Sequence, residues 1–204
     1  MEMTQQSWSF DGQDDAADAC PPGVTLHRRW LAGNHAASLL QQIDRQPWLH
    51  DLQRRVQHYG YRYNYTSRSV TEADALGPLP DWLNPLLERA APLMGQRPEQ
   101  VIVNEYTPGQ GIAPHIDSAA FGAVVMGLSL GGSAEIEFSR SGEQVKKLLL
   151  HHGDLLVMAG EGRGEWTHAI RPRKSDPVEG QRQPRARRVS VTMRTLARIS
   201  PEAR

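Results

Sequence analysis

The chain has 204 residues, equal numbers of basic and acidic side chains (23 each) and 39% hydrophobic residues. This length suits one domain with a single hydrophobic core. Its one cysteine, Cys20, excludes a disulfide framework and a cysteine-built zinc site, and its apolar runs are too short to span a membrane. We find no signal-peptide pattern and expect a soluble, cytoplasmic monomer.

The balanced net charge conceals an uneven distribution. No Lys or Arg precedes Arg28, and residues 1–23 are polar and acidic. From Arg163 onward, 11 basic residues face 4 acidic ones, a surplus of seven positive charges. We predict a flexible acidic arm over 1–23 and a single domain over 24–200, with a basic C-terminal segment that attracts phosphate.

The N-terminal half of this domain predicts two helices and one strand. Helical periodicity favours helices over 34–46, capped by Asn34, and over 79–94. Between them, residues 54–65 carry four tyrosines at a spacing of two, which predicts a strand with one aromatic face. That face either packs against a helix or forms a stacking surface flanked by arginines, and the sequence leaves both interpretations open.

The C-terminal half predicts many short strands separated by glycine and polar turns, which is typical of an all-β barrel or jelly roll. Glu135 and Glu137 alternate on one of them and are expected on a solvated face. Residues 171–187, rich in proline and charge, are expected to form a flexible loop. The predicted strands cover residues 101–106, 123–130, 134–138, 147–150, 155–158, 167–170 and 188–194.

A candidate metal site begins at His115 and Asp117. Residues two apart on a strand point to the same side, so both side chains can contact one ion. His168, on another predicted strand, is a suitable third ligand. Two histidines and one carboxylate form the facial triad of non-haem Fe(II) oxygenases. Zinc in a hydrolase is the alternative metal, although no HExxH helix accompanies these residues.

A second constellation lies on the last predicted strand, where Arg188 and Arg194 share one face and Val189, Val191 and Met193 share the other. Arginines on the inner face of a barrel are costly unless an anion pairs with them. A guanidinium binds a carboxylate through two hydrogen bonds, so a dicarboxylate is a suitable partner. A metal triad with paired arginines indicates 2-oxoglutarate. The competing interpretation is an exposed edge strand with solvated arginines.

Several motifs, in order along residues 56–194, resemble the AlkB family of Fe(II)/2-oxoglutarate dioxygenases. Within that family, the similarity is greatest to the oxygenase domain of the eukaryotic tRNA wobble-uridine hydroxylase. The motifs are Arg55-Val56-Gln57-His58-Tyr59-Gly60-Tyr61, Asn104-Glu105-Tyr106-x-Pro108-Gly109-Gln110-Gly111-Ile112, His115-x-Asp117, Leu155-Leu156-Val157-Met158-x-Gly160, Trp166-x-His168-x-Ile170 and Arg188-x5-Arg194.

The resemblance implies a fold and an activity. The fold is a mainly β double-stranded β-helix (jelly roll) with N-terminal helices and a substrate lid. The activity is the oxidation of a C–H bond with Fe(II), 2-oxoglutarate and O2, releasing succinate and CO2. The implied residues are His115, Asp117 and His168 as catalytic iron ligands, and Asn104, Tyr106, Arg188 and Arg194 as cosubstrate contacts.

The resemblance also implies a nucleic-acid base as substrate, in single-stranded or flipped form. Tyr61, Arg62 and Tyr63 are candidate substrate contacts through stacking and phosphate attraction. The reaction is either demethylation of alkylated DNA or RNA or hydroxylation of a modified tRNA base. Ala119 stands where many repair members carry an acidic residue, which disfavours repair. The sequence also leaves open the oxidation of a protein side chain or small molecule, and a non-catalytic binding domain.

Overall fold

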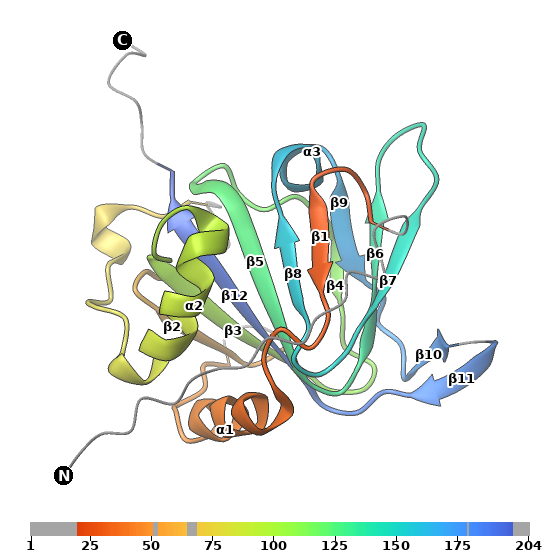
Figure 1. Cartoon of the computed structure of the whole chain (residues 1–204), viewed down its shortest axis with the longest axis horizontal. Helices are drawn as coiled ribbons and strands as arrows, with labels where there is room; N and C mark the ends of the chain where they lie inside the picture. The colour runs from red at the N-terminus through yellow and green to blue at the C-terminus, as the bar shows by residue number, and fades with distance from the viewer. Residues whose placement is uncertain (1–19, 51–52, 65–68, 179, 198–204) are drawn as a thin grey trace.

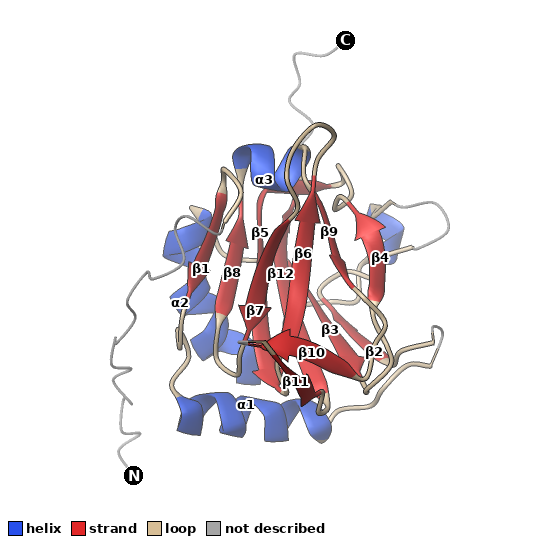
Figure 2. Cartoon of the chain, turned by 90° about the vertical axis from the view of Figure 1, so that its right-hand side faces the viewer, coloured by secondary structure: helices blue, strands red, loops and turns tan. Residues whose placement is uncertain are grey.

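The computed structural model describes residues 20–50, 53–64, 69–178 and 180–197. Two antiparallel sheets pack face to face, and helices cover the outer face of the larger sheet (Figures 1 and 2). This arrangement confirms the predicted mainly β jelly roll. Most of the predicted acidic arm, residues 1–19, lies outside the described residues, as do Tyr65 and residues 198–204.

The larger sheet has six strands in the order β1-β8-β5-β12-β3-β2, all antiparallel. Its neighbouring strands come from segments that lie far apart in the chain, so this sheet joins the N-terminal, central and C-terminal parts of the domain. The strands are β1 (Val24–His27), β2 (Val56–Tyr59), β3 (Gln100–Tyr106), β5 (Phe121–Gly131), β8 (Leu155–Met158) and β12 (Arg188–Leu196).

The smaller sheet has four strands in the order β4-β9-β6-β7. Its register places His115 directly opposite His168, so both candidate histidine ligands lie on neighbouring strands. The strands are β4 (Ile112–His115), β6 (Ala134–Ser139), β7 (Lys146–Leu150) and β9 (Thr167–Ile170).

The alternating pattern of β12 creates two environments. Val189, Val191 and Met193 are fully buried in the core on the helix side of the sheet. Arg188 and Arg194 face the other way, into a cavity between the two sheets. This placement confirms the predicted division of the strand into an apolar face and an arginine face, because side chains alternate along a strand.

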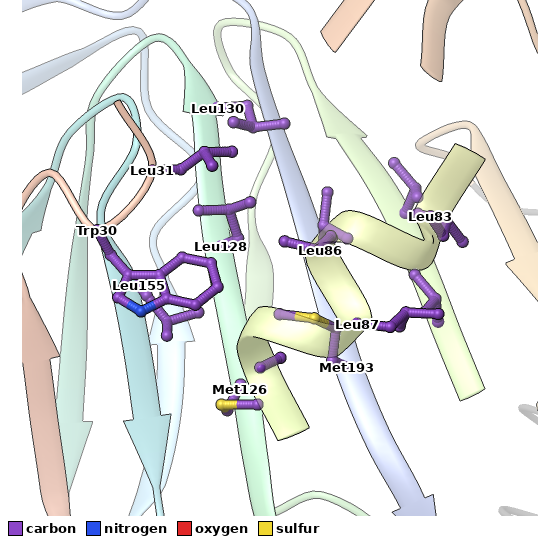
Figure 3. Packing of buried hydrophobic residues seen from close by; sticks show 14 of the residues in the cluster. Trp30, Leu31, Leu83, Leu86, Leu87, Met126, Leu128, Leu130, Leu155 and Met193 are labelled. Atoms are coloured by element: carbon purple, nitrogen blue, oxygen red, sulfur yellow. The ribbon is translucent and has the colours of Figure 1, made fainter. Parts of the chain in front are cut away.

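Two helices bury their apolar faces on the larger sheet, namely α1 (Gly33–Asp44) and α2 (Asn84–Met94). Leu86 and Leu87 of α2 lie over β5 and β12, as Figure 3 shows. Burying a leucine side chain contributes about 1.5–3 kcal/mol, so these contacts fix α2 on the sheet. Short 3-10 turns, η2 (Glu72–Asp74) and η3 (Asp81–Leu83), precede α2, and no described helix is long and apolar enough to cross a membrane.

The helix boundaries differ slightly from the predicted ones. Ala32, rather than Asn34, occupies the N-cap of α1, and the Asn34 side chain accepts a hydrogen bond from the neighbouring backbone N–H of His35. The second helix begins later than residue 79 because the 3-10 turn η3 occupies its expected first turn. It ends at Met94, and the next residue, Gly95, adopts a left-handed conformation with φ of 77°.

The predicted tyrosine strand ends early, at Tyr59. Gly60 has φ of 76°, and a Cβ there would lie 2.1 Å from the carbonyl oxygen of Glu99. The chain therefore turns at Gly60 because only glycine fits the close approach. Tyr59 itself packs edge-on against Trp82 (centroid distance 5.5 Å), so packing against a helical segment holds for this tyrosine.

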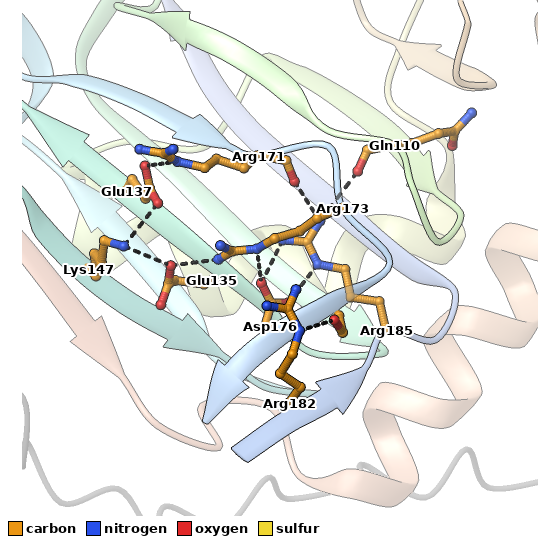
Figure 4. Close-up of polar contacts among 10 residues, drawn as sticks. Gln110, Glu135, Glu137, Lys147, Arg171, Arg173, Asp176, Arg182 and Arg185 are labelled. Atoms are coloured by element: carbon orange, nitrogen blue, oxygen red, sulfur yellow. Dashed lines mark hydrogen bonds and ion pairs between the residues drawn. The ribbon is translucent and has the colours of Figure 1, made fainter. Parts of the chain in front are cut away.

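The predicted flexible loop over 171–187 contains a β-hairpin instead, formed by β10 (Ser175–Val178) and β11 (Gln181–Pro184). Asp176 anchors it by accepting hydrogen bonds from Arg173 (2.8 Å) and Arg185 (2.6 Å) (Figure 4). The proline-rich, charged composition of this segment predicted a loop, because ion pairs that anchor a hairpin leave no alternating apolar pattern in the sequence.

The prediction that Glu135 and Glu137 lie on a solvated face is wrong. Both residues are buried, with 8% and 6% exposure. Arg173 contacts Glu135 and Arg171 contacts Glu137, each at 2.6 Å, while Lys147 lies within 3.4 Å of both carboxylates (Figure 4). Basic side chains from the segment after β9 thus cover these carboxylates from outside.

Candidate active site

A cavity of about 370 Å³ lies between the two sheets. Its walls combine apolar side chains with polar groups that converge from several strands, as in a small-molecule site. The polar wall includes all the residues predicted to bind metal or cosubstrate, namely Asn104, Tyr106, His115, Asp117, His168, Arg188 and Arg194.

The predicted metal ligands lie at one end of this cavity. The imidazole rings of His115 and His168 are 4.3 Å apart between centroids. His168 Nε2 lies 3.7 Å from Asp117 Oδ2. The antiparallel pairing of β4 with β9 brings the two histidines together, and Asp117 follows shortly after β4.

The chemistry of this donor set suits a divalent metal ion. His115 Nδ1 lies 2.9 Å from the carbonyl oxygen of Ala113, a contact that leaves Nε2 available for a metal. Burial, followed by the charge of His115, lowers the pKa of His168 to about 4, so its imidazole is neutral near pH 7 as a ligand must be. In the described residues, however, no three such side chains already stand in a ligating arrangement.

Asp117 is engaged by Arg194, which donates a hydrogen bond to Oδ1. Burial acts to raise the pKa of Asp117, but Arg194, His168, His115 and Arg163 together hold it below its ordinary value. The carboxylate is therefore ionised and oriented, with Oδ2 directed toward His168.

Arg163 holds the segment that carries Asp117, and the sequence did not predict this role. It lies in the short helix α3 (Gly160–Gly164), which precedes His168 along the chain. Its guanidinium donates to the carbonyl oxygens of Asp117 (2.9 Å) and Ser118 (2.7 Å). Arg163 therefore couples the positions of the carboxylate and of the second histidine. The one sequence feature that could have indicated this role is that Arg163 lies shortly before the Trp166-x-His168 motif.

Arg188 forms the other end of the cavity and is 5% exposed. Its Nε donates to Ser129 Oγ at 2.9 Å, while its buried Nη1 has no hydrogen-bond partner among the described residues. Burial lowers the pKa of Arg188 to about 10, so the guanidinium stays charged at neutral pH. An unpaired buried guanidinium suits a carboxylate ligand. This observation fits 2-oxoglutarate at the position that the sequence predicted.

Asn104 and Tyr106 line the cavity beside Arg188, and Arg54 adds a contact that the sequence did not predict. Arg54 Nε donates to Asn104 Oδ1 at 2.9 Å. The guanidinium carbon of Arg54 lies 5.7 Å from the centre of the Tyr106 ring, and that of Arg188 lies 5.6 Å from it. The two arginines thus fix the orientation of both predicted cosubstrate contacts.

The predicted substrate contacts do not share one position. Tyr63 lines the cavity and packs near Phe121, with a centroid distance of 5.6 Å. Tyr61 instead pairs with Ala75 through an isolated bridge, and Arg62 is exposed. The turn at Gly60 separates them from the expected aromatic face, and of the three Tyr63 alone lines the cavity.

The arrangement has a metal-ligand end, an anion-binding end and apolar walls between them. Fe(II) with 2-oxoglutarate and O2, when bound, supplies the oxidising chemistry. Arg188 would bind and orient the distal carboxylate of the cosubstrate, and Asn104 and Tyr106 would donate hydrogen bonds to it. Apolar residues such as Ile102, Ile136 and Leu156 exclude water from the cavity.

Comparison with known proteins agrees with this geometry. Residues 23–194 match the family model described as the 2OG-Fe(II) oxygenase superfamily. The chain is 32% identical over 183 residues to the uncharacterized protein L905 of Acanthamoeba polyphaga mimivirus, covering 85% of each protein. The solved structure of OsALKBH1 superposes with a TM-score of 0.63 over 86% of this chain and 98% of that chain, at 19% identity, which shows the shared fold.

AlkB-family proteins are among the relatives. The chain is 34% identical over 170 residues to the tRNA (carboxymethyluridine(34)-5-O)-methyltransferase alkbh8 of Xenopus tropicalis, covering 78% of this chain but 27% of that protein. It is 33% identical over 104 residues to the alpha-ketoglutarate-dependent dioxygenase AlkB of Escherichia coli, covering 48% of each. These findings confirm the AlkB resemblance, and the chain belongs to the 2OG-Fe(II) oxygenase superfamily as an Fe(II)/2-oxoglutarate-dependent oxidoreductase.

Proposed function

We propose that this oxygenase oxidises a C–H bond of a nucleic-acid base held in single-stranded DNA or RNA. The observation that carries the proposal is one cavity joining His115, Asp117 and His168 at one end to the unpaired guanidinium of Arg188 at the other. The names of its relatives support the substrate class, since they include a tRNA methyltransferase and AlkB.

The size of the cavity favours a single base over a larger group. Its volume is about 370 Å³, and the cosubstrate would take part of that space. A duplex cannot enter such a site, so the base has to be unpaired or flipped out of its stack. Tyr63, on the cavity wall, offers an aromatic ring against which a base can stack.

Two nucleic-acid reactions are compatible with this proposal, namely demethylation of an alkylated base and hydroxylation of a modified tRNA base. Ala119 is exposed and does not line the cavity, whereas Ser118 does. No acidic side chain at position 119 is therefore available to read a base edge, which supports hydroxylation of a tRNA base. The chain spans about a quarter of the length of the Xenopus tRNA methyltransferase, so that protein's full activity is not transferred to it.

The test is a direct assay of base oxidation. The purified chain, supplied with Fe(II), 2-oxoglutarate and ascorbate, would be incubated separately with methylated single-stranded DNA, with an anticodon stem-loop carrying carboxymethyluridine, and with a peptide mixture. We expect mass spectrometry to show a gained oxygen or a lost methyl group in a nucleic acid, together with succinate. His115→Ala should abolish both products, while Arg182→Ala, on the exposed hairpin, should retain them.

Oxidation of the peptide mixture without oxidation of either nucleic acid would contradict the proposed substrate class while leaving the oxygenase chemistry intact. Succinate production by His115→Ala at the rate of the unmodified chain would contradict the metal assignment itself. The two failures are distinguishable because succinate reports the cosubstrate reaction and the mass change reports the substrate.

A further inference from the structure

A second concave site lies away from the cavity between the sheets. This groove has a volume of about 530 Å³ and is formed by three turns: the residues after β1, the β5–β6 turn and the β7–β8 turn. We call it the basic groove. Its lining residues are Arg28, Arg29, Gly131, Ser133, His151, His152 and Asp154.

A buried carboxylate holds the basic groove together. Asp154 is 1% exposed, and its Oδ1 accepts the backbone N–H of Arg29 at 2.9 Å. Its Oδ2 accepts Arg28 Nη1 at 2.7 Å and the backbone N–H of His151 at 2.9 Å. Both oxygens are therefore occupied by donors from two separate turns. Asp154 fixes the shape of the groove and presents no free acceptor to a ligand.

His152 of the groove also presents a donor. The backbone N–H of Gly131 donates to His152 Nδ1 at 2.9 Å. Because Nδ1 is an acceptor, the neutral ring carries its proton on Nε2, which is then a donor. His151 Nδ1 contacts Ser133 Oγ at 3.0 Å. The Asp154 oxygens and His152 Nδ1 already accept hydrogen bonds from the protein, which disfavours a metal cation in the groove.

Arg29 supplies an uncommitted positive charge. Its side chain is exposed, and no hydrogen bond or ion pair engages its guanidinium within the described part of the chain. Its φ of 47° is the one positive φ of a non-glycine residue in that part. This left-handed conformation costs an L-residue about 1–2 kcal/mol. Glycine would adopt this φ without that cost.

We propose that the basic groove binds a phosphate group of a nucleic-acid backbone, through the guanidinium of Arg29, the remaining N–H groups of Arg28 and His152 Nε2–H. Arginine favours phosphate because its forked N–H groups pair with two oxygens. The inference rests on the proposed nucleic-acid substrate and adds a second contact to it.

The groove lies at the far end of the barrel from the candidate metal ligands. Gly131 ends the eleven-residue strand β5, whose first residue, Phe121, packs near Tyr63. Ser133 of the groove lies five residues before Phe138, the β6 residue that pairs with His168, so about 17 Å of strand separates the two sites. Figure 1 shows the β7–β8 turn and α3, whose Arg163 contacts Asp117, at opposite ends of β8. A nucleic acid that reaches both sites therefore has to be a folded or long molecule rather than a short fragment.

The test compares binding of a full-length tRNA transcript with binding of a trinucleotide, which spans about 10 Å when stacked. Neither probe carries a modification, and the protein is kept free of iron and cosubstrate. Arg29→Gly removes the charge and the backbone strain together, while Arg182→Ala, also an exposed arginine but on the hairpin, is the matched control. Inorganic phosphate and inorganic sulfate serve as free-anion competitors.

We expect Arg29→Gly to weaken tRNA binding about tenfold and to reduce the salt slope of log K by about one, with trinucleotide binding unchanged. Its melting temperature should stay the same or rise by roughly 2–4 °C, because glycine adopts positive φ freely. A melting temperature that falls would assign Arg29 a structural role and overturn the proposal.

Three further outcomes would also overturn the phosphate groove. The first is unchanged tRNA affinity in Arg29→Gly. The second is an equal loss of tRNA affinity in Arg182→Ala, which would indicate diffuse electrostatic attraction. The third is a loss of trinucleotide affinity in Arg29→Gly equal to its loss of tRNA affinity. Displacement of tRNA by millimolar phosphate in the unmodified chain but not in Arg29→Gly would support it and would also identify a site for free phosphate. Because these assays involve no turnover, their result is independent of the base-oxidation assay that tests the proposed function.

Discussion

Arg188 carries a buried positive charge whose one side-chain hydrogen bond among the described residues goes to a neutral group, the hydroxyl of Ser129. A buried charge without an anion is costly to the folded protein, so the site is poised for a ligand at the expense of stability. The role of Arg188 was predictable from the sequence, because two arginines on the same face of an inner strand need an anion. Ser129 was not predictable, because 59 residues separate it from Arg188.

Replacing Arg188 with methionine should separate cosubstrate binding from folding. Arg188→Met keeps much of the side-chain length and removes the charge, so we expect the ligand-free protein to unfold at the same or a higher temperature. The affinity for 2-oxoglutarate should fall at least tenfold, because a charge-assisted hydrogen bond contributes about 1.5–3 kcal/mol. Thermal unfolding over a 2-oxoglutarate titration measures both quantities.

Ser129→Ala is the matched control for this experiment, since it removes the hydroxyl that contacts Arg188 Nε and keeps the charge. It should weaken 2-oxoglutarate binding about fivefold, in proportion to about 1 kcal/mol for one hydrogen bond. Full stabilisation of Arg188→Met by 2-oxoglutarate would show that the cosubstrate binds elsewhere.

At the scale of single elements, α3 connects the two halves of the candidate metal site through Arg163. Arg163→Gln should lower the affinity for Fe(II), or for Co(II) as a spectroscopic substitute, by roughly 10–100-fold, the usual effect of losing a group that orients a ligand. This variant leaves all three candidate ligand residues unmutated. Arg140→Gln is the control, because Arg140 contacts Glu161 of the same helix from the surface. Equal affinities for both variants would show that Arg163 does not position Asp117.

The elements that the sequence predicted are those with an apolar face and a regular period. Strand β8 was predicted at its observed bounds, and β12 with its two faces, because alternation specifies burial directly. The hairpin β10–β11, the turn at Gly60 and the helix α3 were missed. Each of them depends on contacts with distant segments, such as Arg173 with Glu135 and Gly60 with Glu99, that leave no local period.

The hairpin β10–β11 depends on Asp176, which is 3% exposed and accepts hydrogen bonds from Arg173 and Arg185. Asp176→Asn leaves the buried Arg185 without a carboxylate and Arg173 with Glu135 alone, and should lower the free energy of unfolding by about 3–5 kcal/mol. Glu161→Gln breaks an ion pair at an exposed site and should change it by less than about 1 kcal/mol. Urea denaturation measures the difference, and equal effects would show that the buried network does not hold the hairpin.

Over the whole molecule, arginines are committed to buried carboxylates as well as to ligands. Arg55 and Arg187 both contact Glu105, and Arg171 contacts Glu137, in addition to the pairs of Asp176. The surplus of positive charge in the C-terminal segment therefore serves the fold first. The total charge therefore says little about a binding partner, and Arg29, which lies outside that segment, keeps its guanidinium free of these carboxylates.

These carboxylates give the fold a specific dependence on acid. Burial acts to raise the pKa of Glu105, Glu137 and Asp176, but their basic partners outweigh it and lower each pKa from ordinary values of 4.5, 4.5 and 3.8. A lowered pKa in the folded state contributes stability above the ordinary pKa, and that stability is lost as the pH falls through the folded value. The free energy of unfolding should thus fall gradually from about pH 6.5, because the unfolded chain protonates His168 before the folded one does, and more steeply below about pH 4 as these carboxylates protonate.

Urea denaturation at each pH tests this dependence, with Asp176→Asn as the comparison that isolates one carboxylate. That variant has already lost the contribution of Asp176, so its stability should fall less between about pH 5 and pH 3 than that of the unmodified chain. Glu161→Gln should follow the unmodified chain, because Glu161 is half exposed. Parallel acid curves for all three proteins would mean that the buried carboxylates do not control the acid stability of this fold.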